Sequence, residues 1–324
     1  MKKLKELKML ASVCTLVYNH EKFIEESLNS TISQKCNFEF EVVVGEDCSP
    51  DQSRKVLLEF KKLHGERLNL LLPEKNLGMM DNFYTTIDAS TGKHIAFCEG
   101  DDFWNTHDKL QKQVDILEMN PDVGLVFSNL NIKEKHRTIQ RVTKHDPNYG
   151  NNPEELLVAN SIATCTVVCR RDLLNEARAF LGEKRFAMGD YPLWLYIAQK
   201  SKIAYVDEPL ATYRIVGGSA TNQGYQKQLF FLESQQEVKA YFMERFTYSE
   251  SIQRRVKVEY LQKRLLLCFL TNNKSELRLC ANELKSLKGK LTLRERVYCI
   301  AGKNYLLALP LMVYHNLYHW LRRS

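Results

Sequence analysis

The sequence predicts an α/β fold in which helices cover both faces of a mostly parallel sheet, followed by a helical C-terminal region. Within the first hundred residues, four short apolar runs alternate with segments of helical periodicity, and short loops join them. The fourth run, 94–98, ends in the carboxylates Glu99, Asp101 and Asp102. Open α/β sheets bind ligands at the carboxyl ends of their strands, so this turn is the first candidate for a functional site.

The elements of the first half follow one another in the order expected for a doubly wound sheet. Apolar runs predict the strands, and an apolar stripe of period 3.6 predicts each helix. The second helix is predicted to begin at Ser49 and Pro50, a hydroxyl cap followed by a proline at the first helical position. The predicted strands are 12–19, 40–44, 68–72 and 94–98, and the predicted helices are 21–32, 50–63 and 79–89.

The middle of the chain has a weaker pattern. Apolar runs predict strands at 123–129 and 162–169, and a helix is predicted to begin at 170–172. The polar and basic stretch 133–152 contains two Gly or Pro positions and predicts a long surface loop. Loops of this kind carry binding specificity, so the choice of acceptor or ligand is expected to be encoded there.

The last hundred residues are predicted to be helical. The apolar spacing is helical from 225 to about 270, where Asn272 and Asn273 interrupt it. Ser275 is a candidate cap for a further helix that ends near Leu287. We therefore divide the chain into an α/β domain, residues 1–220, and a helical region, residues 221–324.

The charge is divided between these two parts. Residues 221–324 carry 18 Lys and Arg against 8 Asp and Glu, whereas residues 1–220 have a net charge of −3. Such asymmetry predicts an anionic partner for the basic region, either lipid headgroups or nucleic acid. No nucleic-acid-binding motif is present, which favours an anionic membrane surface. The run 304–321 has no Lys, Arg, Asp or Glu but is short and polar in places, so it predicts a helix in the membrane interface, or packed on the protein, rather than a span.

The cysteines and the N-terminus predict a cytoplasmic protein. The nine cysteines are scattered and lie mostly within apolar runs, which favours reduced, buried thiols over a disulfide framework. Cys165 and Cys169 have no second pair of ligands at zinc spacing, so no zinc site is expected. The first ten residues lack the long apolar core of a secretory signal.

The acidic turn predicts a metal site. Glu99, Asp101 and Asp102 repel one another unless a cation lies between them, and Mg²⁺ or Mn²⁺ binds carboxylate oxygens together with water and phosphate. Glu46 and Asp47 follow the second strand at the same edge, so one acid cluster can bind a base or ribose while the other holds a metal and a diphosphate. The glycine-rich phosphate loops of dinucleotide-binding enzymes and P-loop NTPases are absent. A solvated acidic turn without a ligand is the alternative interpretation.

In this order and spacing, the segments resemble a family 2 glycosyltransferase of the GT-A fold, of the bacterial cell-surface polysaccharide type. The resemblance covers about residues 9–220. Glu99-Gly100-Asp101-Asp102 matches the family's DxD-type metal-binding motif, and the segment that begins at Gly189-Asp190 resembles the one that carries the catalytic base. The other matching segments are Thr15 to Asn19, Glu46 to Asp51, Asn76 to Gly78 and Tyr213 to Ser219.

The resemblance implies a nucleotide-diphosphate sugar donor, with UDP favoured, a Mn²⁺ or Mg²⁺ ion, a glycan or lipid-linked acceptor, and inversion of the anomeric centre. It implies that Asp101 holds the metal and that Asp190 deprotonates the acceptor hydroxyl. Trp104, Tyr191 and Trp194 are candidates for the acceptor pocket, although aromatic residues are more often part of a core. The donor-binding residues that it implies are Thr15, Val17, Asn19, Glu46, Asp47, Asn76, Gly78, Glu99, Gly100 and Asp102.

Some residues depart from the family pattern, and other interpretations stay open. Glu99 replaces the more usual first aspartate, and Val216 stands where many relatives have a histidine that helps to bind metal or diphosphate. Asp190 has a second interpretation as the cap of a helix that begins at Tyr191. The rivals are a nucleotidyltransferase, which would need a basic glycine-rich loop, and a non-catalytic scaffold or nucleotide-sugar-binding protein on the membrane. The expected location is cytoplasmic and peripheral, on the inner face of the cell membrane.

Overall fold

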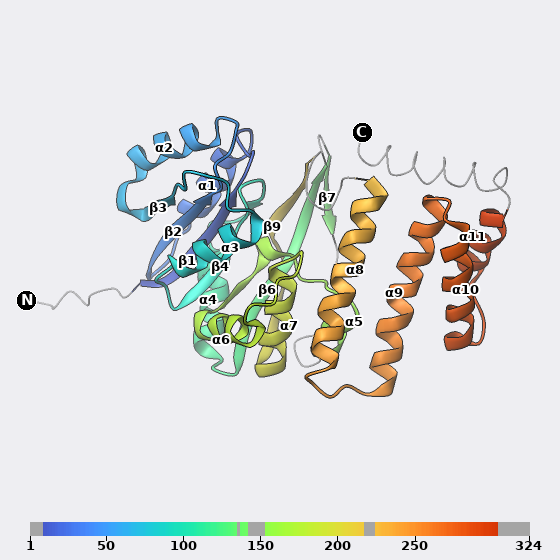
Figure 1. Cartoon of the computed structure of the whole chain (residues 1–324). Helices are drawn as coiled ribbons and strands as arrows, with labels where there is room; N and C mark the ends of the chain where they lie inside the picture. The colour runs from blue at the N-terminus through green and yellow to red at the C-terminus, as the bar shows by residue number, and fades with distance from the viewer. Residues whose placement is uncertain (1–8, 135–136, 142–152, 217–223, 304–324) are drawn as a thin grey trace, which may run out of the picture.

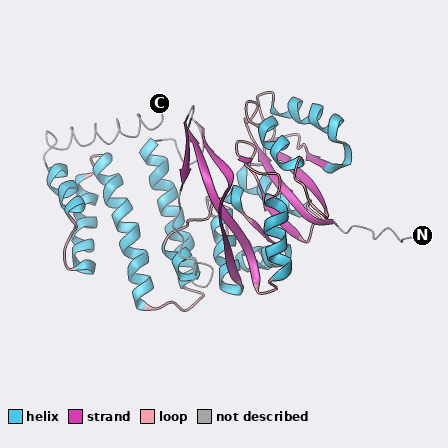
Figure 2. Ribbon diagram, turned by 180° about the vertical axis from the view of Figure 1, so that it is seen from behind, coloured by secondary structure: helices cyan, strands magenta, loops and turns pink. Residues whose placement is uncertain are grey.

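The computed structural model describes residues 9–134, 137–141, 153–216 and 224–303, which form a sheet flanked by helices and a row of helices beside it (Figure 1). The described strands form one sheet in the order β3-β2-β1-β4-β8-β6-β9-β5, with β7 paired to β6. Figure 2 shows this sheet from behind as one continuous, twisted layer. The strands are β1 (Met9–Val17), β2 (Glu39–Glu46), β3 (Leu68–Leu71), β4 (His94–Phe97), β5 (Phe103–Trp104), β6 (Val123–Glu134), β7 (Arg137–Arg141), β8 (Val168–Arg170) and β9 (Lys202–Ile215).

The sheet is mixed and mostly parallel, as the sequence predicts. Strands β3, β2, β1 and β4 are parallel neighbours, and β6 and β9 form a second parallel pair. The short strand β8 lies antiparallel between β4 and β6, so all six of these longer strands run in the same direction. Strands β5 and β7 are antiparallel to β9 and β6. The carboxyl ends of the parallel strands therefore meet at one edge.

Helices cover both faces of the sheet, each over its own apolar core. Strand β4 supplies both cores, because alternate side chains of a strand point to opposite faces. Ile95 and Phe97 pack with α3, α6 and α7, and Ala96 and Cys98 pack with α1, α2 and α4. The helices are α1 (Ile24–Ile32), α2 (Ser53–His64), α3 (Met79–Asp88), α4 (Lys109–Met119), α5 (Pro153–Val158), α6 (Arg171–Leu181), α7 (Asp190–Lys200), α8 (Gly224–Met243), α9 (Glu250–Leu270), α10 (Lys274–Lys288) and α11 (Leu293–Lys303), with 3-10 turns at Gly65–Arg67 and Thr164–Thr166.

The C-terminal helices are joined to the α/β domain by packing. Val238 of α8 and Val256 of α9 belong to the same core as Trp194 of α7. The second half of α9 forms a separate core with α10 and α11. The interface also holds a buried lysine, Lys239, whose Nζ donates to the carbonyl of Val158 at 2.7 Å. The helical region is thus continuous with the domain through α8 and the first half of α9.

None of the described helices combines the length and the apolar character that crossing a membrane requires. The run 304–321, which the sequence predicts to be an interfacial helix, lies outside the described residues. All nine cysteines are free thiols, as their scatter predicts.

The predicted start of the second helix is wrong by a few residues. Helix α2 begins at Ser53 rather than at Pro50. The reason is that Ser49 has other partners: its N–H donates to Oε1 of Glu46 at 2.6 Å, and its hydroxyl accepts from the N–H of Asn19 at 3.1 Å. Asp51 instead accepts a hydrogen bond from the N–H of Ser53 at 2.9 Å. The chain between β2 and α2 is therefore a loop at the carboxyl edge of the sheet.

The middle of the chain differs most from the prediction. The predicted loop 133–152 is wrong in its first part, because β6 continues to Glu134 and turns back as β7, while 142–152 lies outside the described residues. The predicted strand 162–169 contains a 3-10 turn at Thr164–Thr166, and only its last two residues belong to β8. The longest strand, β9, has no counterpart in the prediction. It has the register shifts of a bulge against β6, which interrupt the alternation that identifies a strand.

In the C-terminal region, the predicted helical stretch 225–270 is divided into α8 and α9. The predicted interruption at Asn272 is confirmed, with φ of 55° in the left-handed region that asparagine tolerates. The cap of α10 is Asn273 rather than Ser275, because the side chain of Asn273 accepts from the N–H of Glu276 at 3.3 Å.

Candidate active site

The acidic turn after β4 lies against the end of β1. Strand β1 pairs with β2 as far as Val17 and Glu46, and with β4 as far as Cys14 and Phe97, so three strand ends share this edge. The N–H of Gly100 donates to the carbonyl of Leu16 at 2.9 Å. A Cβ at Gly100 would lie 2.7 Å from Nδ1 of His20, so only glycine fits this approach. Gly100 thus holds the acids beside β1.

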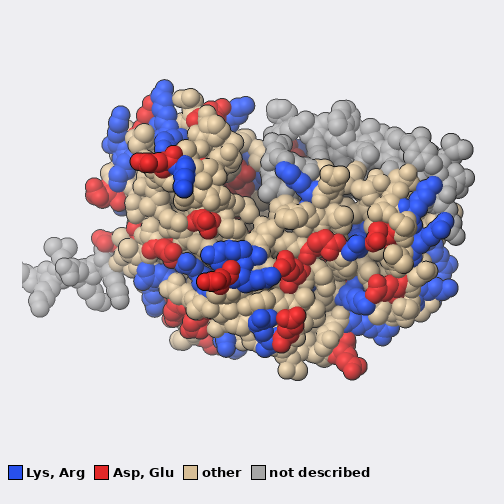
Figure 3. All heavy atoms as spheres, in the orientation of Figure 1, with Lys and Arg blue, Asp and Glu red and all other residues tan. Residues whose placement is uncertain are grey.

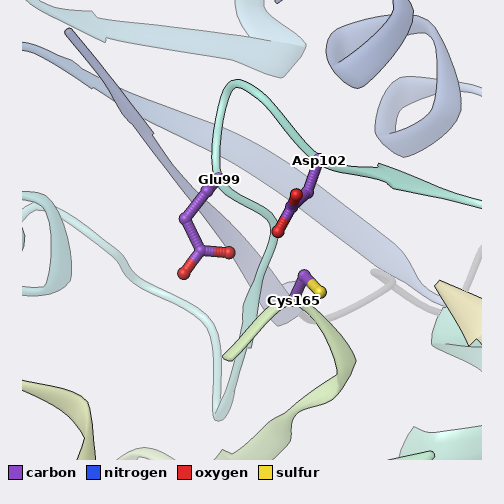
Figure 4. Close-up of side chains that lie close together, drawn as sticks. All are labelled: Glu99, Asp102 and Cys165. Carbon is purple, nitrogen blue, oxygen red and sulfur yellow. The ribbon is translucent and has the colours of Figure 1, made fainter. Parts of the chain in front are cut away.

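Glu99 and Asp102 form the acid cluster at the centre of the site (Figure 4). Their carboxylate oxygens and the sulfur of Cys165 lie within 4.8 Å of one another. Oε2 of Glu99 is buried and has no hydrogen-bond partner among the described residues. Burial, with the neighbouring charges of Asp101 and Asp190, raises the pKa of Glu99 to about 8. Burial also raises the pKa of Asp102 well above its usual range.

This cluster fits a hard divalent cation. Two buried carboxylates beside one another, one with an unpartnered oxygen, cost free energy unless a cation neutralises them. Glu99 and Asp102 supply the oxygen ligands that Mg²⁺ and Mn²⁺ prefer. Cys165 fits less well, because burial raises the pKa of its thiol well above the ordinary value and the thiol hydrogen-bonds the Asp102 carboxylate. The two carboxylates are therefore the candidate metal ligands of this cluster.

The predicted metal ligand Asp101 faces a different neighbour. Its Oδ2 lies 3.8 Å from Nε2 of His20, and its side chain is partly exposed. Nδ1 of His20 is buried and has no partner within the described part of the chain. Burial lowers the pKa of His20 against the opposing effect of Asp101. The assignment of Asp101 as a metal ligand stays a prediction, and the geometry adds Glu99 and Asp102 to it.

The predicted base, Asp190, shares a cavity with the acid cluster. This cavity has a volume of about 230 Å³ and is lined by Glu99, Asp102, Leu130, Ile162, Ala163, Thr164, Asp190 and Tyr213. Asp190 is the first residue of α7, and Gly189 holds the cap position, so Asp190 is not the N-cap of the helix. Oγ1 of Thr164 donates to its Oδ2 at 2.7 Å, and the N–H of Tyr191 donates to its Oδ1 at 2.7 Å. The carboxylate is thus fixed at the cavity wall, where the helix dipole favours its negative charge.

Glu46 is held by the protein itself. It is fully buried, and its Oε2 accepts from Nε of Arg54 at 2.6 Å in an ion pair. Its Oε1 accepts from the N–H of Ser49. Since both oxygens have partners, Glu46 shapes the loop after β2, and the prediction that its side chain contacts the donor is corrected.

Asp47 joins the loop after β2 to the loop before α3. Its carboxylate accepts from the N–H of Leu77 at 2.6 Å and from the N–H of Gly78 at 3.0 Å. The side chain of Asn76 donates to the carbonyl of Asp47 at 2.8 Å. Gly78 has φ of 88°, which only glycine adopts readily. The predicted residues Asp47, Asn76 and Gly78 are therefore brought together as one clasp between two loops.

The predicted donor-binding residues of β1 divide between the core and the surface. Thr15 and Val17 are buried, and Oγ1 of Thr15 has no hydrogen-bond partner among the described residues. Asn19 is exposed and has φ of 61°. Of these three side chains, Asn19 alone is open to a ligand.

The three aromatic residues predicted for the acceptor pocket lie in the core instead. Tyr191 and Trp194 are 0% exposed, and Trp104 is 4% exposed. The hydroxyl of Tyr191 donates to the carbonyl of Leu156 at 2.9 Å, and Nε1 of Trp104 donates to the carbonyl of Cys165 at 3.1 Å. The prediction is corrected, because packing leaves these rings no surface for an acceptor. Trp104 and Tyr191 still position the site, since they anchor the segments beside Cys165 and Asp190.

Arg214 is a candidate site residue that the sequence pattern did not single out. Its guanidinium is 4.7 Å from the ring of Phe23 and 5.0 Å from the ring of Phe103, and it donates to Glu26 at 2.6 Å. Its backbone N–H donates to Oδ1 of Asp102 at 2.8 Å, while its Nε has no partner in the described residues. It thus places a buried cation with a free donor beside the acidic turn. The signal was present in Tyr213-Arg214, but it identified only the end of the domain.

This arrangement of a mixed, mostly parallel sheet with acids at the carboxyl end of β4 is that of the GT-A fold. The family model for glycosyl transferase family 2 matches residues 12–178, slightly more than half of the chain, so the chain belongs to family 2 of the glycosyltransferases.

Named curated relatives agree with this family. The putative teichuronic acid biosynthesis glycosyltransferase TuaG of Bacillus subtilis is 28% identical over 221 residues, which cover 68% of this chain and 84% of that protein. The glucosyltransferase WfgD of Escherichia coli is 29% identical over 199 residues, 61% of this chain and 73% of that protein. Uncharacterized proteins of Mycobacterium tuberculosis and Mycobacterium bovis are 32% identical over 116 residues, so the chain spans about a third of their length (34%).

Two solved structures have the same fold at low sequence identity. The S. aureus TarS fragment 1–349 in complex with UDP-GlcNAc has a TM-score of 0.55 at 16% identity, covering 91% of this chain and 92% of that one. The mannosyltransferase PcManGT of Pyrobaculum calidifontis, in complex with GDP-Man and Mn²⁺, has a TM-score of 0.56 at 16% identity, covering 97% and 85%.

Proposed function

We propose that this protein is an inverting, metal-dependent glycosyltransferase that moves a sugar from a UDP-sugar to a glycan or lipid-linked acceptor in bacterial surface polysaccharide synthesis. The observation that carries the proposal is the shared cavity of Glu99, Asp102 and Asp190. It puts two neighbouring acids, one with an unpartnered oxygen, and a fixed carboxylate on the walls of one space. These are the two requirements of the reaction: a place for a metal and a diphosphate, and a base for the acceptor hydroxyl.

The donor end of the site is assigned to the acidic turn. Glu99 and Asp102 would hold the divalent metal, with Asp101 beside them, and a metal bound there stabilises the negative charge of a departing diphosphate. Arg214, whose Nε is free, would donate to a phosphate oxygen. The clasp of Asp47, Asn76 and Gly78, with the exposed Asn19, forms the loops that would surround the nucleoside. The name of WfgD includes a UDP-glucose donor, and the TarS structure contains UDP-GlcNAc. Both support UDP as the nucleotide.

The acceptor end is assigned to Asp190. Its carboxylate would accept the proton of the acceptor hydroxyl as the oxygen attacks the anomeric carbon. Thr164 and the N–H of Tyr191 fix its two oxygens, so the base is oriented before the acceptor arrives. The base and the acid cluster lie on the wall of one cavity, so attack from the side opposite the diphosphate would invert the anomeric centre.

The basic helical region supports a location at the cytoplasmic face of the membrane. On the exposed side of α10, Lys274, Arg278 and Lys285 fall within about 40° of one another at helical spacing, and the described residues give them no acidic partner. A stripe of cations on one face suits an anionic lipid surface. The name of WfgD includes a lipid-diphosphate acceptor, and such an acceptor would lie at a membrane surface.

A donor panel tests the proposed activity. We expect purified protein with Mn²⁺ to transfer sugar from one of UDP-glucose, UDP-GlcNAc and GDP-mannose to a lipid-diphosphate-linked GlcNAc, with nucleoside diphosphate released in equal amount. EDTA should stop the reaction, and Mn²⁺ should restore it. Donor binding without transfer to any acceptor, in protein of native stability, would favour the non-catalytic alternative.

A further inference from the structure

A second pocket, separate from the catalytic cavity, lies between α3 and α6. It has a volume of about 200 Å³ and is lined by Tyr84, Asn175, Arg178, Leu181, Gly182 and Arg185. The guanidinium carbons of Arg178 and Arg185 lie 4.8 and 5.6 Å from the centre of the Tyr84 ring. Two cations thus lie at cation–π distance from one aromatic ring in a partly enclosed space.

The described residues that line the pocket supply several hydrogen-bond donors and no carboxylate. Asp88, outside the lining, pairs with Arg178 through the two terminal guanidinium nitrogens. Arg185 donates to the carbonyl of Gly182 at 3.3 Å and, among the described residues, has no carboxylate partner. The hydroxyl of Tyr84 and the amide of Asn175 also have no hydrogen-bond partner in the described part of the chain. One positive charge and several donors are therefore free, which is the chemistry of an anion site.

The pocket is close to the predicted base. Gly189 packs against α3, because a Cβ there would lie 2.9 Å from Cε of Met80. Tyr84 follows Met80 by one helical turn on the same face. Burial raises the pKa of Tyr84, and the charges of Arg185 and Asp190 act on it in opposite directions. The segment 182–189 runs from the rim of the pocket to Asp190.

We propose that the pocket of Tyr84, Arg178 and Arg185 binds an anionic group of the acceptor, a phosphate or a sugar carboxylate, while the acceptor hydroxyl lies at Asp190. The identification of the ligand as part of the acceptor rests on the proposed function, whereas the binding of an anion does not. The donor diphosphate is assigned to the acidic turn, so this pocket has no role in holding it. A planar guanidinium over an aromatic ring suits oxygen anions of either kind, and the two sources are separated by experiment.

Calorimetric titration of small anions tests the site directly. The probes are pyrophosphate and glucuronate, with methyl glucoside as the neutral control, all in EDTA so that no metal holds anions at the acidic turn. We expect one of the two anions to bind and R185Q to weaken it about tenfold, with R185K intermediate because lysine keeps the charge but loses the planar fork. The preferred anion identifies the source, a phosphate-bearing acceptor or an acidic sugar.

The matched control is K184Q. Lys184 is the neighbour of Arg185, is paired with Glu237 and is not part of the pocket lining, so its removal changes the net charge equally without altering the site. We expect wild-type affinity for K184Q. The proposal is overturned if neither anion binds up to about 50 mM, or if R185Q and K184Q weaken binding equally. UDP binding with Mn²⁺ is measured in parallel. If the wild type does not bind UDP, the proposed function is refuted, but the anion titration still tests the pocket.

Discussion

The buried acids of the two parts of the molecule have opposite environments. Glu99, at the end of β4, has a buried oxygen without a partner, and its pKa is raised to about 8. Glu295, at the start of α11, accepts from Lys288, from Gln262 and from the N–H of Thr292, although burial opposes its ionisation. These hydrogen bonds lower the pKa of Glu295 to about 2. One acid costs the folded chain free energy, and the other stabilises it.

The surrounding charges show the same contrast. Across the helical region, on the face shown in Figure 3, basic and acidic side chains lie next to one another. Within this region, Lys257 pairs with Glu283 and Arg264 pairs with Glu276. Among the described residues, neither Glu99 nor Asp102 forms an ion pair with a lysine or arginine, and Arg214 contacts Asp102 through its backbone N–H. The proposed metal would supply the positive charge that these acids lack.

The largest effect is expected from Asp190, the proposed base. Asp190→Asn removes the proposed proton acceptor and keeps the shape, so kcat should fall about 10³-fold or more, with the affinity for UDP and Mn²⁺ changed less than about twofold. The measurement is steady-state transfer together with calorimetry of the nucleotide. Asp122→Asn is the matched control, because Asp122 is an exposed carboxylate paired with Lys202 before β6. Near-normal turnover of Asp190→Asn would exclude this residue as the base.

The next largest effect is expected on the free energy of unfolding, which Glu99 and Glu295 should change in opposite directions. In EDTA at pH 8, Glu99→Gln should raise the free energy of unfolding by about 2 kcal/mol, because it removes a buried charge that has no partner. The same substitution should reduce the stabilisation that Mn²⁺ gives to the wild type. Urea unfolding with and without Mn²⁺ measures both. A destabilised Glu99→Gln protein in EDTA would mean that the fold itself needs this charge.

Glu295→Gln should act in the opposite direction. It removes a charge that accepts several hydrogen bonds, so the free energy of unfolding should fall by about 1–2 kcal/mol. Mn²⁺ should make no difference to this loss, since Glu295 lies in the helical region away from the acid cluster. Equal sensitivity to Mn²⁺ in the two variants would remove the distinction between the regions.

Glu99 and Glu295 should also change the stability of the fold in different pH ranges. Glu99 has a folded-state pKa of about 8 against an ordinary value of 4.5, so the folded state keeps its proton longer and the metal-free stability falls as the pH rises between these values. Glu295 has a folded-state pKa of about 2, so its contribution is complete above about pH 4.5 and is lost as the pH falls toward 2. The stability difference between wild type and Glu99→Gln should therefore grow from pH 5 to about pH 8. The difference for Glu295→Gln should instead shrink below about pH 4.5.

The sequence predicted the strands and motif residues of the site better than the burial and contacts of its side chains. The four parallel strands of the first half were found because each is a continuous apolar run that ends in polar residues, and Glu99 and Asp190 were singled out from short motifs. Strand β9 was missed because its bulged register breaks the alternation that marks a strand. Trp194 and Tyr191 were predicted to line the acceptor pocket but are buried, because position in a motif does not reveal burial. That Glu46 is already paired with Arg54 is likewise a contact between separate segments, which no local pattern contains.

Calorimetric titration of UDP into the wild type, Glu99→Gln and Asp102→Asn, each with Mn²⁺ and with EDTA, tests the proposed role of the acid cluster most directly. We expect tight binding to the wild type with Mn²⁺ alone, and affinity at least tenfold weaker in both variants, because the acid cluster would hold the metal that holds the diphosphate. Equal UDP affinity in EDTA and Mn²⁺, or wild-type affinity in both variants, would contradict it.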